Sequence, residues 1–348
     1  MSGLDRSGPS ASAEAVLVIR FSSLGDVLLA GPALRALRAR FPNSRIDFLT
    51  AKEYAAAAAL LSGSDRILTF DRRRGLGGLL RLRRDLSRRY TVLVDLQNSP
   101  RSAFLRTTTL PVFWVKAKRY RFRRWLLIHL KWDLYGETKP VPIRYLDAAA
   151  MVGGQDDGGG LELRVPEDAR TWASDFVARH GEGRRLAVLC PGARHFTKRW
   201  PAERWMEVGR ELSASNWFVT AVGSGAEEQL LHTVAETVRG AAILQDRSIP
   251  EIAALMEKAA VVISNDSGLM HLAGGVRAPL VALFGPTVRH FGFYPFRANA
   301  VVLDHELSCR PCRALGGPKC PKTHFRCMLN TSPAEVLAAI DALPGGTT

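Results

Sequence analysis

Small polar residues follow an apolar segment in the last third of the chain. Residues 261–264 have the composition of a buried strand, and Asn265, Asp266, Ser267 and Gly268 come directly after them. A helix is expected to begin at Gly268, so the backbone N–H groups of its first turn would suit a phosphate. Asp266 and Ser267 could equally serve only as helix caps, and the local sequence leaves both interpretations open.

His271 belongs to the same candidate site. It lies four residues after Ser267 and therefore shares its face of the expected helix. A buried structural histidine is the alternative. A second apolar segment, residues 280–284, ends at a Gly-Pro-Thr turn. Two strand ends would then contribute loops at one edge of a sheet, the usual place for a ligand in an open α/β fold.

A cluster of cations follows another apolar segment, residues 186–190. Arg194, Lys198 and Arg199 lie close together on a loop that is expected at the carboxyl end of a strand. Such a loop suits a diphosphate leaving group, whose negative charge grows as the bond to it breaks. A solvated basic loop in which residues 200–201 pack against the next helix is the alternative.

A single glycine and an acidic residue, Gly25 and Asp26, precede an expected helix over residues 27–41. A glycine at such a turn lets the backbone approach a ligand, but there is no G-x-G-x-x-G pattern to indicate a dinucleotide site. Asp26 could cap the helix, or it could take a proton from a sugar hydroxyl. Farther along, Glu227 or Glu228 could accept a hydrogen bond from a ribose, although both would also compensate a helix dipole.

The segments that must position these residues alternate between strands and helices. One such series fills the first half of the chain, and a second begins near residue 186. The alternation predicts two doubly wound parallel sheets. We expect a disordered tail over 1–14, a first domain over 15–165 that includes a Gly-rich linker over 153–165, a second domain over 166–330, and a final helix and tail over 331–348.

Composition and charge restrict the class of protein. The chain has 348 residues, of which 47% are hydrophobic and 23% charged, as in soluble globular proteins of two domains. No apolar run is long enough to cross a bilayer and no secretion signal is recognisable, which predicts a cytoplasmic protein. The net charge of +15 predicts an anionic partner. Nucleic acid is not expected, because no helix-turn-helix, RNA-binding or zinc-finger pattern is present.

Four of the five cysteines form a cluster. Cys309, Cys312, Cys320 and Cys327 have the spacing C-x2-C-x7-C-x6-C. In the cytosol disulfides are disfavoured, so the cluster is a candidate for a structural zinc or iron site. Four reduced thiols without a metal are the alternative. Cys190 is interpreted as a small buried apolar residue.

Four motifs together resemble glycosyltransferase family 9, the bacterial heptosyltransferases. They are RFSSLGDVLLAGPALRAL, PGA(x4)KRWPxERW, SNDSGLMHLA and PLVALFGPT, in the family's order over residues 15–340. The resemblance implies a GT-B fold, an α/β architecture of two Rossmann-like domains facing a central cleft. It also implies an inverting, metal-independent transfer of L-glycero-D-manno-heptose from ADP-heptose to the inner core of lipopolysaccharide.

The same resemblance assigns roles to single residues. Asp26 resembles the general base on the acceptor hydroxyl, and Lys198 resembles the lysine that stabilises the departing diphosphate. Ala193 and Arg194 depart from members that have hydroxyl residues for the phosphates. The residues expected to bind the donor are Gly25, Arg194, Glu227, Glu228, Asp266, Ser267, Gly268 and His271. Those expected to bind the acceptor are Gln97, Arg101, Ser102, Arg119 and Arg121.

The basic first half fits an anionic acceptor on a membrane face. Residues 116–124, followed by the apolar residues 125–128, resemble an interfacial segment, which predicts peripheral contact with the cytoplasmic face of the inner membrane. A solvated basic helix over a buried apolar face is the alternative. Two rival functions remain: a transferase of the same family with another nucleotide sugar or a protein acceptor, and an inactive nucleotide-sugar-binding protein. Retention of both Asp26 and Lys198 argues against the inactive protein.

Overall fold

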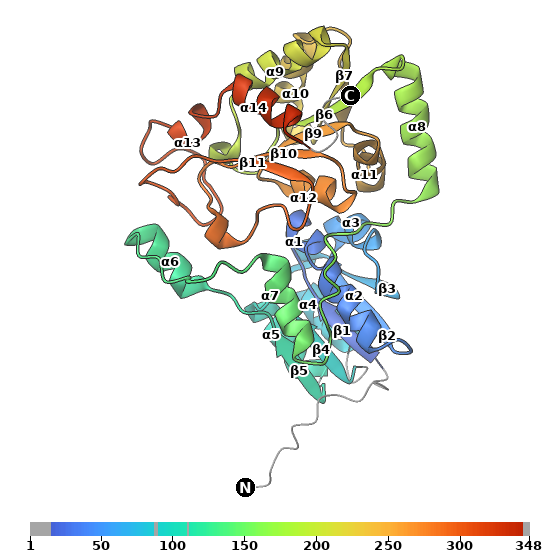
Figure 1. Cartoon of the computed structure of the whole chain (residues 1–348). Helices are drawn as coiled ribbons and strands as arrows, with labels where there is room; N and C mark the ends of the chain where they lie inside the picture. Colours follow the sequence, from blue (N-terminus) through green and yellow to red (C-terminus); the bar gives the residue numbers. More distant parts are fainter. Residues whose placement is uncertain (1–14, 87–89, 110, 344–348) are drawn as a thin grey trace. The chain divides into compact units, whose positions relative to one another are not determined.

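A computed structural model describes residues 15–86, 90–109 and 111–343, so the predicted tail over 1–14 lies outside the described residues (Figure 1). The chain divides into two compact units. The first contains the residues up to Arg119 together with Val141–Arg164, and the second contains Tyr120–Pro140 and the residues from Val165 onward. The two units correspond to the two expected α/β series.

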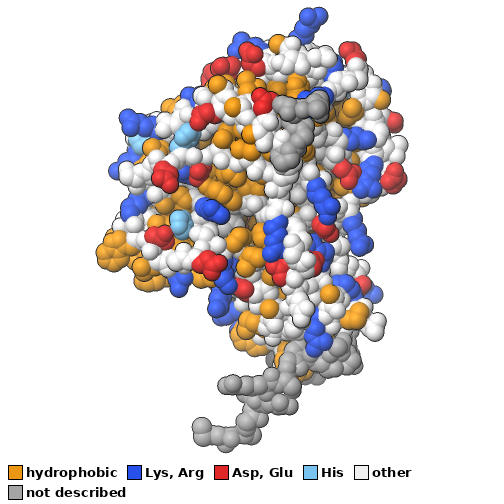
Figure 2. Space-filling model, in the orientation of Figure 1, with side chains coloured by type: hydrophobic (Ala, Val, Ile, Leu, Met, Phe, Trp, Pro, Cys, Tyr) orange, Lys and Arg blue, Asp and Glu red, His pale blue; other side chains and the backbone are white. Residues whose placement is uncertain are grey.

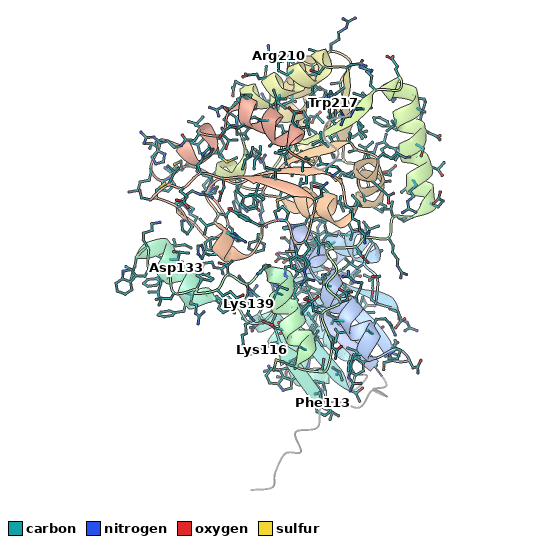
Figure 3. The ribbon with its side chains drawn as sticks, viewed as in Figure 1. Phe113, Lys116, Asp133, Lys139, Arg210 and Trp217 are labelled. Carbon is teal, nitrogen blue, oxygen red and sulfur yellow. The ribbon has the colours of Figure 1, made fainter. Side chains whose placement is uncertain are left out.

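A five-stranded parallel sheet with the strand order β3-β2-β1-β4-β5 forms the centre of the first unit. In its middle strand, Val18 aligns with Phe48 on one side and with Val94 on the other. Phe113 and Lys116 mark the two ends of the edge strand β5 (Figure 3). The strands are β1 (Ala15–Ile19), β2 (Arg45–Ala51), β3 (Arg66–Phe70), β4 (Val92–Asp95) and β5 (Phe113–Lys116). All residues of β1 are buried, as expected for a parallel strand between layers of helices.

The helix expected over 27–41 is instead two helices. α1 ends at Leu28 and α2 begins at Gly31, with Pro32 in its first turn. Proline has no N–H to continue the preceding helix, but it suits the start of a new one, and this explains the break. The described helices of this unit are α1 (Leu24–Leu28), α2 (Gly31–Arg40), α3 (Ala55–Ala59), α4 (Gly75–Leu86), α5 (Pro100–Thr109) and α7 (Val141–Ala150), with the 3-10 turns η1 (Lys52–Tyr54) and η2 (Arg72–Arg74).

The second unit contains a six-stranded parallel sheet with the strand order β11-β10-β9-β6-β7-β8. Its core includes Trp200 and Trp205, whose rings meet edge to face with centroids 5.3 Å apart. The strands are β6 (Arg185–Cys190), β7 (Trp217–Gly223), β8 (Ala242–Gln245), β9 (Val261–Asn265), β10 (Leu280–Leu283) and β11 (Ala300–Leu303). Cys190 is buried at the end of β6, as predicted.

Helices and short 3-10 turns surround this second sheet. The described helices are α6 (Arg121–His129), α8 (Glu167–Gly181), α9 (Ala202–Ala214), α10 (Glu228–Glu236), α11 (Ile249–Glu257), α12 (Gly268–Gly275), α13 (Arg326–Leu329) and α14 (Pro333–Asp341). The turns are η3 (Phe196–Lys198), η4 (Gly225–Glu227) and η5 (Arg289–Phe291). Among the helices in the described ranges, none has both the length and the apolar character that crossing a membrane requires.

Two segments group differently from the domain bounds that the sequence suggests. Residues 120–140 group with the second unit, because Leu127 and Tyr135 pack against Phe291. The Gly-rich stretch, expected as a linker, is held within the first unit: Arg35 pairs with Asp157 at 2.7 Å and also donates to the Gly160 carbonyl. Its composition permits the turns, while the ion pair decides where it lies.

In each sheet the order of the strands reverses at one point. The reversal lies between β1 and β4 in the first unit and between β6 and β9 in the second. Loops that leave neighbouring strands at such a reversal diverge to opposite faces of the sheet, and this leaves room for a ligand at the carboxyl edge. Each unit therefore has one position where the fold itself favours binding.

Candidate functional site

The basic loop after β6 is held in place by residues of β9. The carboxamide of Asn265 accepts from the Trp200 N–H at 3.1 Å and donates to the Pro191 carbonyl at 2.7 Å. Asn265 is completely buried, so these two hydrogen bonds join both ends of the loop to the reversal point of the second sheet. The loop carries Lys198 at the end of η3.

Lys198 forms an ion pair with Asp266. The distance from its Nζ to Oδ2 of Asp266 is 2.5 Å, and the two side chains are only 13% and 6% exposed. The hydroxyl of Thr287, on the turn after β10, donates to the same carboxylate oxygen at 2.6 Å. Arg310 in turn donates to the Thr287 carbonyl at 2.6 Å. The ammonium group is therefore fixed in position by a buried polar network rather than left to move in solvent.

The polar residues that follow β9 do more than cap the helix α12. Ser267 occupies the N-cap position of α12, but its side chain makes no capping hydrogen bond. Asp266 is committed to Lys198 and Thr287. Gly268 opens the helix, and His271 is buried within it. These four predicted donor residues thus lie together at the start of α12, beside the cation of the neighbouring loop.

The remaining side chains of the basic loop make its environment positive. Arg194 is exposed, whereas His195 is half-buried. Burial lowers the pKa of His195, and the nearby charges of Lys198 and Arg194 lower it further. His195 therefore stays neutral at neutral pH, and the positive charge of the loop comes from its lysine and arginines.

Glu227 and Glu228 differ in their surroundings. Glu227 accepts from the backbone N–H and the hydroxyl of Ser224, both at 3.0 Å, and a Cβ added to Gly192 would overlap its carboxylate. Glu227 therefore lies against the turn that follows β6. Glu228 is exposed at the first position of α10. Of the two predicted ribose ligands, the structure places Glu227 beside the loop of Lys198.

In the first unit, Asp26 lies beside the reversal point between β1 and β4. Its Oδ1 is 2.6 Å from a guanidinium nitrogen of Arg20, and its Oδ2 accepts from the N–H and the hydroxyl of Ser23, both at 3.0 Å. Arg20 also donates to the Leu96 carbonyl at 3.0 Å and lies over the ring of Tyr145. The N-cap of α1 is Ser23, so Asp26 is not the cap itself: it lies inside the helix, completes the capping box of Ser23, and is at the same time held by a buried cation.

The charge state of Asp26 follows from these contacts. Burial raises the pKa of the carboxyl group, but the Arg20 charge and the hydrogen bonds from Ser23 outweigh it, so the pKa lies below the ordinary value. The carboxylate is therefore ionised at neutral pH. An ionised carboxylate with a fixed orientation is able to accept a proton from a hydroxyl group.

A pocket of about 320 Å³ opens near the same edge of the first sheet. Two arginines, Arg72 and Arg101, and the side chain of Gln97 line it. The other lining residues are Phe21, Ser22, Phe70, Ser99 and Pro100. Two cations beside apolar side chains suit a sugar that carries carboxylate or phosphate groups.

The predicted acceptor residues separate into different environments. Gln97 and Arg101 line the pocket, while Ser102 is completely buried and its hydroxyl donates to the Ser99 carbonyl at 2.9 Å. Arg119 donates to the Asn98 carbonyl at 3.4 Å, and Arg121 opens α6 of the second unit. Gly25, predicted on the donor side, is buried in α1 of the first unit next to Asp26. Ser102 therefore shapes the turn before α5, whereas Gln97 and Arg101 line the pocket.

The cysteine-bearing segment, residues 309–327, supports the basic loop that carries Lys198. Thr197 and Gly317 exchange hydrogen bonds: the Gly317 N–H donates to the threonine hydroxyl at 2.8 Å, and the Thr197 N–H donates to the Gly317 carbonyl at 3.1 Å. Thr197 is buried and precedes Lys198. Residues far along the chain thus fix the backbone that carries the ammonium group.

All five cysteines lie in the described residues and none is in a disulfide. Burial raises the pKa of Cys312, and the neighbouring thiols Cys309 and Cys320 raise it further. Burial raises the pKa of Cys327 to about 11. Within the part of the chain that the structure describes, no three His, Cys, Asp or Glu side chains are arranged to hold a metal ion. A zinc or iron site at the cysteines stays a prediction.

Comparison with known proteins identifies the family. Residues 79–319 match the family model described as glycosyltransferase family 9 (heptosyltransferase). The chain belongs to glycosyltransferase family 9. It is 27% identical over 311 residues to lipopolysaccharide heptosyltransferase 1 of Pseudomonas aeruginosa, with 85% of each chain covered. The resemblance seen in the motifs is thereby confirmed, and the chain is a glycosyltransferase.

Solved structures agree with the family 9 fold. The E. coli ADP-heptose lipopolysaccharide heptosyltransferase II has a TM-score of 0.73 at 22% identity, with 94% of this chain and 98% of that chain covered. The E. coli heptosyltransferase WaaC with ADP-2-deoxy-2-fluoro heptose has a TM-score of 0.67 at 20% identity, with 94% and 99% covered. The predicted GT-B-type α/β fold with two parallel sheets is confirmed.

Several residues that organise this glycosyltransferase site were not among the predicted ones. They are Arg20, Asn265, Thr287 and Arg310. Arg20, Asn265 and Thr287 lie inside the quoted motifs, so a charged or polar side chain beside a candidate residue was a signal available in the sequence. Arg310 has no such signal, because its partner lies 23 residues away along the chain.

Proposed function

We propose that this glycosyltransferase transfers L-glycero-D-manno-heptose from ADP-heptose to the inner core of lipopolysaccharide, with inversion at the sugar. The observation that carries the proposal is the buried Lys198–Asp266–Thr287 network at the reversal point of the second sheet. It holds a cation where a nucleotide diphosphate is expected in this topology. The names of the similar proteins, which include heptosyltransferases of lipopolysaccharide and a complex with an ADP-heptose analogue, support the choice of donor and acceptor.

On the donor side, Lys198 neutralises the diphosphate as it leaves. The bond between the anomeric carbon and the diphosphate oxygen breaks, and negative charge accumulates on that oxygen. The N-terminal end of α12 contributes its partial positive charge to the same group. Glu227 is available for a ribose hydroxyl beside the Gly192 turn. Because these groups supply the positive charge, we propose that the transfer requires no catalytic metal.

On the acceptor side, Asp26 takes the proton from the attacking hydroxyl. The oxygen then forms its bond to the anomeric carbon from the face opposite the diphosphate, which inverts the configuration. Arg72 and Arg101 bind the anionic groups of the acceptor in the pocket of the first unit. The acceptor is anchored in a membrane, so we propose that the enzyme acts at the cytoplasmic face of the inner membrane.

The experiment that tests the proposal is ADP-heptose turnover by Asp26→Asn. Asparagine cannot take a proton, so we expect turnover to fall by about a hundredfold or more while the Kd for ADP stays unchanged. Near-normal turnover would remove Asp26 from the role of base. Full activity of the unmodified protein in the presence of EDTA is expected if catalysis needs no metal, and loss of activity there would contradict that part of the proposal.

A donor other than ADP-heptose, or a protein acceptor, is the alternative within the family. Competition of other nucleotide sugars against ADP-heptose in the same assay separates these cases. Metal analysis of the purified protein and of Cys309→Ser/Cys312→Ser decides whether the cysteine segment takes up zinc or iron. We propose that such a metal would be structural, because the segment acts on Thr197 through hydrogen bonds of Gly317.

A further inference from the structure

Helix α6 is apolar on two faces. Its inner face is anchored in the second unit, where Leu127 packs with Tyr135 and Phe291, and Val288 and Phe293 adjoin the cluster. Leu126 is buried as well. These residues account for part of the apolar run that the sequence suggested as lipid-facing, and they are not available to lipid.

The outer face of α6 is apolar too. Phe122 is 70% exposed and Trp125 is 51% exposed, one helical turn apart. The chain beyond the helix continues the surface, since Trp132 is 61% exposed and Leu130 and Leu134 are also exposed. Figure 2 shows hydrophobic side chains gathered over α6 at the left of the view. We call these five residues the aromatic edge.

Cations accompany the aromatic edge. Between residues 121 and 134 the chain has four Lys and Arg residues and a single acidic one, Asp133. Asp133, which lies just beyond α6 (Figure 3), pairs with His290 at 3.0 Å. Lys131 donates to the backbone carbonyls of Cys309 and Pro311 and so fixes the chain after α6 against the second unit. Arg121 is exposed and Arg124 half-buried on the helix itself.

We propose that the aromatic edge docks the protein onto a bilayer that contains anionic lipids. Tryptophan and phenylalanine prefer the boundary between headgroups and acyl chains, while arginine stems lie along apolar surface and place their charges among the phosphates. The net positive charge of the segment complements such headgroups. A helix of nine residues is far too short to span a membrane, so it would lie in the interface plane. The inference deepens the proposed function, since a lipid-anchored acceptor is presented on such a surface.

Vesicle co-sedimentation tests this proposal by measuring binding alone, independently of enzymatic activity. The full chain is mixed with vesicles of phosphatidylcholine alone or of phosphatidylcholine with phosphatidylglycerol, and bound protein is measured. We expect binding to the anionic vesicles with a blue shift of tryptophan fluorescence. Trp125→Ala/Trp132→Ala should bind about tenfold or more weakly, and Arg124→Gln should lose part of the preference for anionic vesicles.

Matched variants keep the test specific. Leu76→Ala/Met151→Ala removes exposed apolar side chains elsewhere, and Arg210→Gln removes an exposed cation of α9 (Figure 3); both should bind as the unchanged protein does. The changed side chains are exposed, except that Arg124 is half-buried, and thermal denaturation checks that each variant folds. Equal binding of the tryptophan variant and the unchanged protein would overturn the proposal. So would self-association that depends on the two tryptophans without vesicle binding, because the edge would then face a second copy.

The outcome also separates this inference from the activity. Heptose transfer to an acceptor freed of its lipid should be unchanged in Trp125→Ala/Trp132→Ala, since these side chains lie outside the proposed site. Vesicle binding without any heptose transfer would leave the docking surface standing and refute the proposed reaction. Heptose transfer without vesicle binding would refute the docking surface and leave the proposed reaction standing.

Discussion

At the scale of single residues, the charge of Asp26 is set by opposing effects. Burial alone would favour the neutral acid, and the Arg20 guanidinium at 2.6 Å reverses that preference. Because its pKa is lowered, Asp26 contributes stability that is present above about pH 3.9, the unfolded value, and is lost as the pH falls through the folded pKa. Asp26 is therefore ionised at neutral pH, as its proposed role of base requires.

Removing the Arg20 charge should shift this balance. In Arg20→Gln the burial effect dominates, so the pKa of Asp26 rises and the acidic limb of the pH profile of kcat/KM moves to higher pH. The free energy of unfolding should fall by about 3 kcal/mol, because a buried charge loses its partner. Steady-state kinetics over a pH series measures the first effect and denaturant unfolding the second. Arg20→Lys keeps the charge and serves as control; an unmoved acidic limb in Arg20→Gln would refute the role of Arg20.

Lys198 is the residue whose loss should affect both donor binding and chemistry. In Lys198→Ala we expect kcat to fall about a hundredfold and the Kd for ADP to rise, since the diphosphate loses a cation in the bound state and in the transition state. Calorimetric titration with ADP and initial-rate measurements check this. Arg194→Ala removes the exposed cation of the same loop and should have the smaller effect. Unchanged kinetics in Lys198→Ala would disprove the assignment.

At the scale of elements, the site depends on loops that are held by distant segments. Asn265 of β9 holds both ends of the loop after β6, and the segment around Gly317 holds its middle. Gly316 has a positive φ of 89°, and a Cβ there would lie 3.3 Å from Cγ of Lys198. The cysteine-bearing segment thus packs against the side chain that the proposed reaction uses.

Thr197→Val tests this support. Valine has a similar shape but leaves the Gly317 N–H without its hydroxyl acceptor, which should cost about 1–3 kcal/mol of unfolding free energy. Because the backbone before Lys198 is loosened, the Kd for ADP should also rise. Thermal denaturation and ADP titration measure both quantities. Thr197→Ser restores the hydroxyl, so both the stability and the Kd should recover. An unchanged Kd in the valine variant would show that the hydrogen bonds between Thr197 and Gly317 do not position Lys198.

At the scale of the whole molecule, the net charge of +15 predicts salt-sensitive recognition of an anionic acceptor. The Debye length falls from about 10 Å at 0.1 M to about 3 Å at 1 M ionic strength. The KM for the acceptor should therefore rise with salt while kcat at saturation changes little. Initial rates over an ionic-strength series provide the measurement. A KM that is independent of salt would show that the surplus charge has no part in binding.

Much of the fold and the site follows from local sequence. Apolar strand segments alternating with helices predict both parallel sheets and the loops that carry Asp26 and Lys198, whereas the roles of these two residues come from the family resemblance. The single helix predicted over 27–41 is wrong because Pro32 has no N–H to continue a helix and instead starts a new one. Their order in the sequence places residues 120–140 in the first domain, but they belong to the second unit. The contact with Phe291 that holds them there joins residues far apart in the sequence, so neighbouring residues do not predict it.

Order along the chain is enough to predict strands, helices and the loops that carry reactive side chains, since these depend on periodicity and on turn residues close in sequence. Which distant charged side chains form ion pairs is decided only when the chain folds. Lys198 pairs with Asp266 only because strand register and loop closure bring them together, whereas Arg20 and Asp26 are close in sequence and need only the turn after β1. The same holds for α6, whose inner and outer apolar faces look alike in the sequence. Only packing against Phe291 buries one face and leaves Trp125 exposed.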